Sequence, residues 1–365
     1  MNKVIQRKPL MTSDHLTFCI INYNGENYLE ETIRSVLKQK HAQDEIILID
    51  NASVDRSLSI VKEKFSGVKI VQLKKNLGPG AARNAGFKCS LNDLIVFLDN
   101  DVCLTNNSIR QLIAEFEKRP KVAAAMPCVL YADRPNIIQY DGADMHYLGL
   151  MILRNANHNL GKLKNCEPQK TGSIVTACFF MDRKRWELGK PFDEDFFMYF
   201  EDHDFGLKIR THGYDILSVP AATVLHREGT PGLSLRKHGQ YAPLRVFNNI
   251  RNRWQIILKF FSLRSLFILF PILAIYEAFQ FAVALKKGWM REWFSALFWI
   301  MNNANRICNK RLQVQRNRKI SDREIFRNGP LPFAPEFAQT RLEERAIKFL
   351  NGISMTYWKY AKHLL

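Results

Sequence analysis

The stretch VFLDNDVCL, from Val96 to Leu104, joins a run of apolar residues to a polar group at its end. The apolar residues predict a buried strand, yet Asp99, Asn100 and Asp101 follow it directly. A buried carboxylate without a partner either costs several kcal/mol or loses its charge, so these side chains need a cation, a hydrogen-bonding ligand or open water. The stretch therefore predicts a buried strand whose end carries a binding site.

Three further apolar runs alternate with amphipathic segments through the first half of the chain. They are LTFCIINYN, DEIILIDNAS and VKIVQL, and a predicted helix follows each one. Strands that alternate with helices are typical of parallel βαβ units, and continuous apolar strands indicate a sheet covered on both faces. We therefore predict an α/β fold.

Polar side chains end three of these four runs. They are Asn22, Tyr23 and Asn24; Asp50, Asn51 and Ser53; and Asp99, Asn100 and Asp101. Ligands of open α/β sheets bind at the carboxyl ends of the strands, so the sequence predicts a site at this edge of the sheet.

The composition indicates a globular protein whose positive charge is unevenly placed. The 365 residues are 47% hydrophobic and carry a formal net charge of +18. From Val246 to the end there are 20 Lys and Arg against 7 Asp and Glu. This asymmetry predicts a basic partner surface in roughly the last third of the chain.

Cysteine usage and the N-terminal sequence both bear on the cellular compartment. The seven cysteines form no C-x-x-C pair, which favours a reducing environment. The first residues, MNKVIQRKPLMTSD, contain no apolar stretch of signal-peptide length. We expect the N-terminal domain to face the cytoplasm.

An apolar segment of near-transmembrane length, Ser265 to Leu285, carries Pro271, Glu277 and Gln280, and the run WFSALFWIM follows it. A Glu at the bilayer centre costs ~2.5–3.5 kcal/mol. We favour a helical hairpin in the membrane interface, with a true span and a buried helix pair as alternatives. The basic run NKRLQVQRNRK would then meet anionic headgroups or form a solvated helix face.

Two local patterns predict phosphate chemistry. Asp99 and Asp101 leave an extended segment on the same face and can hold a divalent cation, although Asp-Asn-Asp is also typical of a turn after a strand. The segment NLGPGAARNAG, Asn76 to Gly86, starts a helix and places Arg83 where it could face an anion, although its small residues would also allow close packing on the sheet. It has neither G-K-[ST] nor G-x-G-x-x-G, which argues against an ATPase or a dinucleotide enzyme.

Taken in order, the motifs resemble the inverting GT-A glycosyltransferases of family 2, especially the bacterial branch that builds surface polysaccharides and includes rhamnosyltransferases. The motifs lie between Leu16 and about Arg253 and are IINYNGENYLEETIRSVLKQ, ILIDNASVDRS, NLGPGAARNAG, FLDNDV, FFMYFEDHDFGLKIRTHGY and VLH. The resemblance implies a GT-A fold with a mixed, mainly parallel central sheet, followed by a C-terminal helical, membrane-associated region.

We expect four parts along the chain. They are an N-terminal extension (1–15), a nucleotide-sugar-binding half of the GT-A domain (16–125), an acceptor-binding and catalytic half (126–250), and a basic, apolar helical region at the membrane interface (251–365).

The resemblance also implies roles for single residues. Asp202, in the segment FEDHD, is the implied general base, and Asp101 with His226 would bind Mg²⁺ or Mn²⁺. The implied donor site consists of Asn22, Tyr23, Asn24, Asp50, Asn76, Gly78, Arg83, Asp99 and Asn100, in which Asp50 reads the base and Asp99 contacts the ribose. If residues after Phe200 are helical, Glu201 and Asp202 point about 100° apart and only one faces the acceptor. We expect His203 at the surface.

We therefore expect an inverting glycosyltransferase that moves a sugar from a nucleotide-diphosphate donor to a lipid-linked or cell-surface saccharide, at the cytoplasmic face of the cell membrane. Its partners would be these substrates and an anionic membrane surface, with no nucleic acid. Two alternatives are a sugar nucleotidyltransferase, which would have a Gly-rich loop after the first strand, and a non-catalytic binder, which has no need of the acidic residues. The acceptor side is least defined, because Gly189-Lys190-Pro191 and Thr176-Ala177 depart from the family pattern.

Overall fold

The structure is a computed structural model that describes residues 15–163, 166–186, 188–227, 242–333 and 340–365. The chain divides into two compact units. Unit 1 takes in the described residues of Met1–Ala143, Arg154–Ile209 and Tyr214–Ser234, and unit 2 those of Asp144–Leu153, Arg210–Gly213 and Leu235–Leu365.

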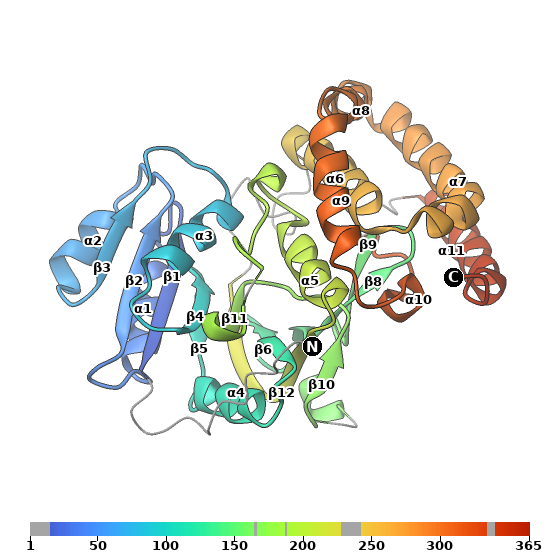
Figure 1. The fold of residues 1–365 in the computed structure, drawn as a ribbon. Helices are drawn as coiled ribbons and strands as arrows, with labels where there is room; N and C mark the ends of the chain where they lie inside the picture. The colour runs from blue at the N-terminus through green and yellow to red at the C-terminus, as the bar shows by residue number, and fades with distance from the viewer. Residues whose placement is uncertain (1–14, 164–165, 187, 228–241, 334–339) are drawn as a thin grey trace. The chain divides into compact units, whose positions relative to one another are not determined.

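Unit 1 is built on a ten-stranded mixed sheet (Figure 1). The strand order is β10-β12-β6-β11-β4-β1-β2-β3, with β5 paired to β12 and β7 paired to β6. The strands are β1 (Leu16–Asn22), β2 (Glu45–Asp50), β3 (Lys69–Gln72), β4 (Leu94–Asp99), β5 (Val102–Leu104), β6 (Val122–Tyr131), β7 (Ile138–Tyr140), β10 (Gln169–Thr171), β11 (Cys178–Asp182) and β12 (Asp215–His226). Strands β3, β2, β1 and β4 are parallel, and β11 runs antiparallel to β4 and β6. The predicted α/β fold with a mixed sheet is confirmed.

Five α-helices of unit 1 follow its strands as the sequence pattern predicts. They are α1 (Leu29–Leu37), α2 (Ser57–Lys64), α3 (Pro79–Cys89), α4 (Ser108–Glu117) and α5 (Glu201–Thr211). Every residue of β1 is buried, and so are all residues of β2 and β4 except one at an end of each. Strands buried in this way need cover on both faces of the sheet, which the helices provide.

Close packing of α3 on the sheet depends on Gly86. A Cβ atom at Gly86 would lie 2.2 Å from Sγ of Cys19 in β1 and 3.4 Å from Ile49 in β2. Cys19 is itself fully buried, so the sulfur has no room to move away. The small residues of this segment therefore do serve helix packing, while Arg83 on the same helix reaches the site described below.

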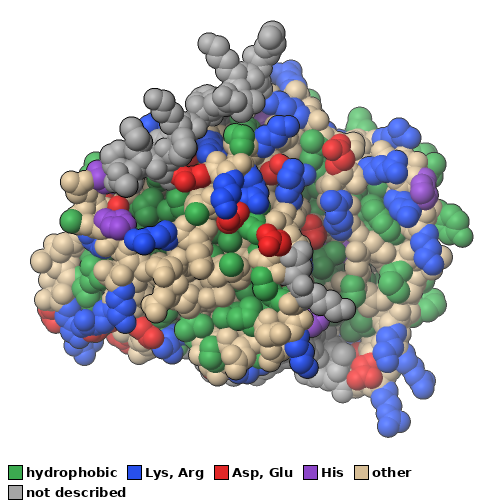
Figure 2. Space-filling view, turned by 90° about the horizontal axis from the view of Figure 1, so that it is seen from below, with side chains coloured by type: hydrophobic (Ala, Val, Ile, Leu, Met, Phe, Trp, Pro, Cys, Tyr) green, Lys and Arg blue, Asp and Glu red, His purple; other side chains and the backbone are tan. Residues whose placement is uncertain are grey.

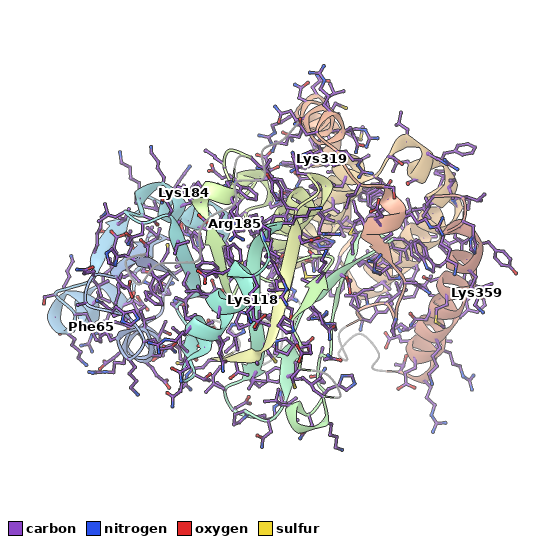
Figure 3. The ribbon with its side chains drawn as sticks, turned by 60° about the horizontal axis from the view of Figure 1, so that its bottom comes forward. Phe65, Lys118, Lys184, Arg185, Lys319 and Lys359 are labelled. Atoms are coloured by element: carbon purple, nitrogen blue, oxygen red, sulfur yellow. The ribbon has the colours of Figure 1, made fainter. Side chains whose placement is uncertain are left out.

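An arginine caps the C-terminal end of α4. Nη1 of Arg185, which lies just after β11, donates to the carbonyls of Phe116, Arg119 and Val122 at 3.4, 3.1 and 3.2 Å (Figure 3). The last carbonyls of a helix lack partners within the helix and attract a positive charge. Arg185 thus ties α4 to the strand that lies between β4 and β6.

Unit 2 consists of helices and a small three-stranded sheet. The sheet has the order β13-β8-β9, and the helices α7 and α8 form the expected hairpin, joined at Gly288 and Trp289. The elements are β8 (Ala143–His146), β9 (Leu150–Leu153), α6 (Pro243–Phe260), α7 (Leu263–Lys287), α8 (Met290–Asn302), α9 (Ala304–Arg316), α10 (Asp322–Ile325), β13 (Phe326–Arg327) and α11 (Arg341–Ala361).

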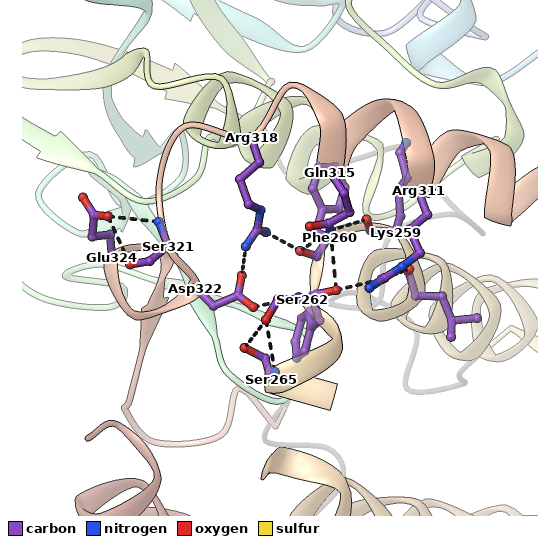
Figure 4. Close-up of polar contacts among 12 residues, drawn as sticks. Lys259, Phe260, Ser262, Ser265, Arg311, Gln315, Arg318, Ser321, Asp322 and Glu324 are labelled. Carbon is purple, nitrogen blue, oxygen red and sulfur yellow. Dashed lines mark hydrogen bonds and ion pairs between the residues drawn. The ribbon is translucent and has the colours of Figure 1, made fainter. Parts of the chain in front are cut away.

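A polar cluster in unit 2 fixes the turn between α6 and α7 (Figure 4). Nη1 of Arg311 donates to the Leu258 carbonyl at 2.7 Å, and Arg318 donates to the Phe260 carbonyl and to the carboxylate of Asp322. These carbonyls end α6 and would otherwise lack donors. Within the basic run, Arg311 and Arg318 fit neither the headgroup contact nor the solvated helix face considered above, because both side chains bind the end of α6.

Gly86→Ala should lower the free energy of unfolding by about 1–3 kcal/mol, because the added methyl group overpacks the contact with Cys19. The clash must outweigh the gain of up to ~1 kcal/mol that Ala brings to a helix. Urea denaturation of the full chain measures this difference. Gly67→Ala is the matched control, since a Cβ there meets nothing within 4 Å. Equal stability of the two variants would contradict the packing argument.

Candidate active site

The carboxyl ends of β1, β2 and β4 are joined through the side chain of Asn22. Its Nδ2 donates to Oδ1 of Asp50 at 2.9 Å, and its Oδ1 accepts from Nδ2 of Asn100 at 2.9 Å. All three side chains are buried. The polar residues that end these strands therefore meet at one edge of the sheet, as the sequence predicts.

Asp50 is saturated by partners within the protein. Its Oδ2 accepts from the Ser53 backbone N–H at 3.1 Å, its Oδ1 accepts from Asn22, and the residue has no exposed surface. In this conformation Asp50 positions its neighbours and offers no face to a nucleobase. Its predicted contact with the base stays a prediction that requires this loop to shift.

The loops after β1 and β2 are locked by positive backbone angles. Asn24 and Ala52 have φ of 50° and 62°, which lie in a backbone region that residues other than glycine seldom adopt. The Asn24 N–H donates to Oγ of Ser53 at 2.9 Å, and Oδ1 of Asn24 accepts from the Val54 N–H at 2.9 Å. Tyr23, which precedes Asn24, is half-buried. Strained residues of this kind cluster at binding sites.

Asn76 and Gly78 shape the loop before α3. Oδ1 of Asn76 accepts from Nδ2 of Asn51 at 2.8 Å and from the Gly78 N–H at 2.9 Å. Gly78 has φ of 85°, and a Cβ there would lie 1.9 Å from the carbonyl oxygen of Phe197. Only glycine fits this position, so the loop before α3 touches the loop before α5.

Arg83 lies buried between two acidic segments that are far apart in the sequence. Its Nη2 donates to Oδ1 of Asp99 at 2.5 Å and to the Thr176 carbonyl at 3.0 Å, and its Nη1 lies 3.9 Å from Oε1 of Glu201. Only 2% of the Arg83 side chain is exposed. Arg83 therefore anchors carboxylates in this conformation, and its predicted contact with a phosphate stays a prediction.

The two acids at the start of α5, Glu201 and Asp202, both have a raised pKa but differ in their hydrogen bonds. Burial, and after it the charge of Asp202, raises the pKa of Glu201 to about 8. Oε2 of Glu201 is buried without a hydrogen-bond partner among the described residues. Burial also raises the pKa of Asp202, to about 6, but its Oδ1 accepts from the His203 N–H at 2.7 Å. Burial thus raises the pKa of both acids, and the hydrogen bond from the His203 N–H makes half-buried Asp202 the more acidic of the two.

The backbone before α5 is strained at three aromatic residues. Phe197, Tyr199 and Phe200 have φ of 58°, 64° and 67°. Each such residue costs about 1–3 kcal/mol and persists only where surrounding structure enforces it. The contact with Gly78 is one such constraint, and it sets where α5 begins and where its first two carboxyl groups point.

Asp101 and His226 are brought together by strand pairing. His226 ends β12 and is paired with Val102 in β5, so its ring lies beside Asp101. Nε2 of His226 is 3.3 Å from Oδ1 of Asp101, and Nδ1 of His226 is 2.7 Å from Oε1 of Gln139 in β7. A carboxylate and an imidazole nitrogen are suitable cation ligands. Within the described residues, no group of three or more His, Cys, Asp or Glu side chains is placed to hold a metal, so further ligands must come from a bound molecule or water.

Opposing effects act on the pKa of Asp99, which lies next to this pair. Burial raises its pKa, and the negative charge of Asp101 raises it further, while the guanidinium of Arg83 opposes the shift. A cation or a hydrogen-bond donor from a ligand would relieve this clustering of negative charge.

Two residues of β7 belong to this region and were missed by the sequence interpretation. Gln139 contacts His226, and the pKa of Tyr140 is raised mainly by burial and then by the negative charges of neighbours that include Asp99 and Asp202. Oη of Tyr140 is buried without a hydrogen-bond partner in the part of the chain that the structure describes. The available signal was a Gln-Tyr pair directly after two isoleucines, Ile137 and Ile138.

Residues 17–188 match the model of the family described as glycosyl transferase family 2. This chain carries a family 2 glycosyltransferase domain. A relative described as an uncharacterized glycosyltransferase of Haemophilus influenzae is 39% identical over 92 residues, which are 24% of this chain and 37% of that protein. The chain thus spans little more than a third of that relative's length.

A second relative matches this chain over a longer stretch. The N-acetylglucosaminyl-diphospho-decaprenol L-rhamnosyltransferase of Mycobacterium tuberculosis is 25% identical over 239 residues, which are 59% of this chain and 77% of that protein. The crystal structure of GalNAc-T7 with UDP, GalNAc and Mn²⁺ has a TM-score of 0.54 at 21% identity and covers 67% of this chain and 48% of that one. The likeness to GalNAc-T7 shows the fold alone, which is GT-A.

The sequence interpretation was wrong about the position of one residue of this site. His203 was expected at the surface, but it is fully buried, and its Nδ1 lies 2.7 Å from Oγ of Ser173. Burial lowers the pKa of His203 to about 3, so the ring is neutral. The helix face that His203 occupies is turned into unit 1, which residue type alone did not indicate.

If Asp202 is the base of this glycosyltransferase, kcat should rise with pH through about 6, because the carboxyl group must lose its proton first. Asp202→Asn should lower kcat by ~10²–10⁴-fold. Glu201→Gln resembles the protonated acid and should keep kcat within about tenfold, since its neighbour supplies the base. Steady-state transfer assays against pH measure all three. A loss in Glu201→Gln equal to that in Asp202→Asn would assign the base to Glu201.

Proposed function

We propose that this protein is an inverting glycosyltransferase that moves a sugar from a nucleotide-diphosphate donor, with UDP- or dTDP-sugars favoured, to a hydroxyl of a lipid-linked or cell-surface saccharide. One observation carries the proposal: Arg83 lies between Asp99 and Glu201, so the strand-end acids and the acids of α5 share one site. A donor group and a base that act on the same bond need this proximity.

The proposed reaction is a single displacement in which Asp202 is the base. The acceptor oxygen forms a bond to the anomeric carbon while its proton passes to Asp202. The bond between the anomeric carbon and the phosphate oxygen breaks, and its electron pair leaves with the nucleotide diphosphate. The anomeric configuration inverts. Neutral Glu201 would keep negative charge near the base low, which helps the carboxylate of Asp202 stay ionised.

Asp101 and His226 would hold Mg²⁺ or Mn²⁺. Their ligand atoms lie 3.3 Å apart with few other acids to complete a shell, which suits a cation that also takes oxygens from a diphosphate. When bound, the cation supplies positive charge to the leaving diphosphate. The GalNAc-T7 structure contains Mn²⁺ together with UDP.

The donor nucleotide would lie along the ends of β1, β2 and β4. Tyr23 and Asn24 are half-buried there, and Asn76, Gly78 and Asn100 shape the same edge. Calorimetric titration with UDP, dTDP, GDP and CMP, each with and without Mn²⁺, tests this site. We expect one diphosphate to bind only with the metal, and metal-independent or absent binding of all four would contradict the proposal.

Asp101→Asn should weaken Mn²⁺-dependent turnover by about 10²-fold or more, because the leaving diphosphate loses the charge that the metal supplies. Membrane association should be unchanged, since the substitution lies in unit 1. Transfer assays and vesicle sedimentation of the same preparation measure both. Unchanged turnover would exclude Asp101 as a metal ligand.

The proposed acceptor is lipid-linked, and two observations support it. The Mycobacterium relative is named for an acceptor attached to a diphospho-decaprenol lipid. In addition, α7 turns apolar side chains to the solvent, with Leu263, Phe267 and Phe270 exposed by 75%, 85% and 68%. An acceptor anchored in a membrane calls for an enzyme that binds the membrane surface.

Helix α7 is apolar on its exposed face as well as on its buried face, unlike the surface helix of a soluble protein. Its buried residues are mainly apolar and include Leu269, Ile272 and Leu273. Two of its polar side chains are bonded within the protein, since Glu277 is paired with Arg253 of α6, and Nε2 of Gln280 donates to Oη of Tyr276 in the same helix at 2.7 Å. Among the described residues, α7 is the one helix long and apolar enough to cross a bilayer, and only 22% of its most apolar window is buried. A core helix would be mostly buried, so the buried-pair alternative loses support.

We favour insertion of the α7–α8 hairpin into the membrane interface, on the cytoplasmic side. Phe294 and Phe298 of α8 are exposed by 57% and 64% and are one helical turn apart. Figure 2 shows the face of the molecule seen from below, where Lys and Arg side chains lie among hydrophobic ones.

Replacing both Phe267 and Phe270 with Ser should weaken binding to vesicles that contain anionic lipid by at least about tenfold, because each buried Phe contributes ~1.5–3 kcal/mol. Vesicle sedimentation measures the partition, and an alkaline carbonate wash separates an interfacial hairpin from a true span. Leu91→Ser is the matched control, since Leu91 is 77% exposed in unit 1. Equal partition of the double variant and the control would contradict the interfacial site.

A further inference from the structure

Strand β7 brings a buried amide to the proposed cation ligand. Val129 in β6 pairs with Tyr140 in β7, and Tyr131 in β6 pairs with His226 in β12, so β7 and β12 flank the same part of β6. Gln139 is 6% exposed, and its Oε1 lies 2.7 Å from Nδ1 of His226. The contact is therefore buried and defined by two strand pairings.

The chemistry of this contact determines which nitrogen of His226 carries hydrogen. The amide oxygen of Gln139 can only accept, so Nδ1 of His226 must donate. In the neutral ring Nε2 then carries a lone pair, which lies 3.3 Å from Oδ1 of Asp101. Two acceptor atoms at this separation repel each other unless a positive charge lies between them, either a proton on Nε2 or a bound cation. The arrangement thus favours a cation at this point, in competition with a proton.

We propose that Gln139 is a positioning residue that selects the Nδ1–H tautomer of His226 and so turns Nε2 toward a divalent cation shared with Asp101. The inference rests on the proposed function, because it concerns the metal of that reaction. Histidines that bind metals usually donate their other N–H to an oxygen acceptor, and loss of that acceptor costs about 10–100-fold in metal affinity. Here the acceptor is a neutral amide.

An amide also permits the opposite arrangement when no metal is bound. If the side-chain amide of Gln139 rotated by 180°, its Nε2 would donate to Nδ1 of His226. Nε2–H of His226 would then donate to Asp101. An ionised carboxylate cannot donate, so Gln139→Glu allows only the metal-binding tautomer. Gln139→Leu, similar in size, allows neither contact. These two substitutions therefore separate the tautomer effect from simple space filling.

The test measures Mn²⁺ affinity of the full chain by calorimetry, with Mn²⁺ alone and with Mn²⁺ plus UDP. We expect Gln139→Leu to weaken Mn²⁺ binding about 10–100-fold and Gln139→Glu to retain it within about threefold. The control is Gln39→Leu, which removes another partly buried amide of unit 1, bonded to the Thr105 carbonyl at 2.6 Å. Thermal unfolding of each variant confirms that it folds.

A second readout reports the tautomer itself. Nitrogen-15 NMR of labelled histidine, with Mg²⁺ and UDP and with His226→Asn for assignment, should show Nδ1–H at His226 in the unaltered chain and in Gln139→Glu. Loss of this single tautomer in Gln139→Leu would support the proposal. Equal Mn²⁺ affinity in Gln139→Leu and the unaltered chain would overturn it, and so would an equal fall in both Gln139 variants. Binding of UDP without any Mn²⁺ binding would overturn the metal site and, with it, the role of Gln139, while the donor site would stand.

Discussion

The buried guanidinium of Arg83 is the interaction on which the site depends. It joins the end of β4 to the start of α5 through Asp99 and Glu201, and it also holds the Thr176 carbonyl next to β11. A buried ion pair adds little to stability by itself, but removal of one partner leaves an uncompensated charge and costs about 3–5 kcal/mol. The geometry of both acidic segments is thus coupled through one side chain.

That coupling accounts for the different states of neighbouring acids. Arg83 faces a group of carboxyls that burial would otherwise keep protonated, and its charge does not suffice for all of them. Glu201 keeps a raised pKa, whereas Asp202 gains a backbone hydrogen bond from His203 and remains the more acidic of the two. Two adjacent carboxyl groups therefore differ in pKa because their environments differ.

The backbone next to these acids is strained, and α7 in unit 2 has an exposed apolar face. Phe197 and its aromatic neighbours hold left-handed backbone against Gly78, so the loop before α5 has little freedom to move its carboxyl groups. In unit 2, by contrast, α7 keeps Glu277 paired inside and its phenylalanines outside. One unit is organised around buried charge, and the other exposes apolar side chains, which is the surface that the proposed membrane contact would use.

The sequence by itself determined the parts that depend on contiguous residues. Apolar runs with polar ends located β1, β2 and β4, and the ordered motifs identified the family, because strand burial and short motifs are local properties. Only the tertiary structure placed His226 beside Asp101, since that contact follows from the pairing of β5 with β12, more than 120 residues apart in the sequence. The tertiary structure also shows that His203 is buried, that burial raises the pKa of Glu201 and that Gln139 contacts His226. Each of these depends on what packs against a side chain, and a side chain's neighbours in space are not its neighbours in sequence.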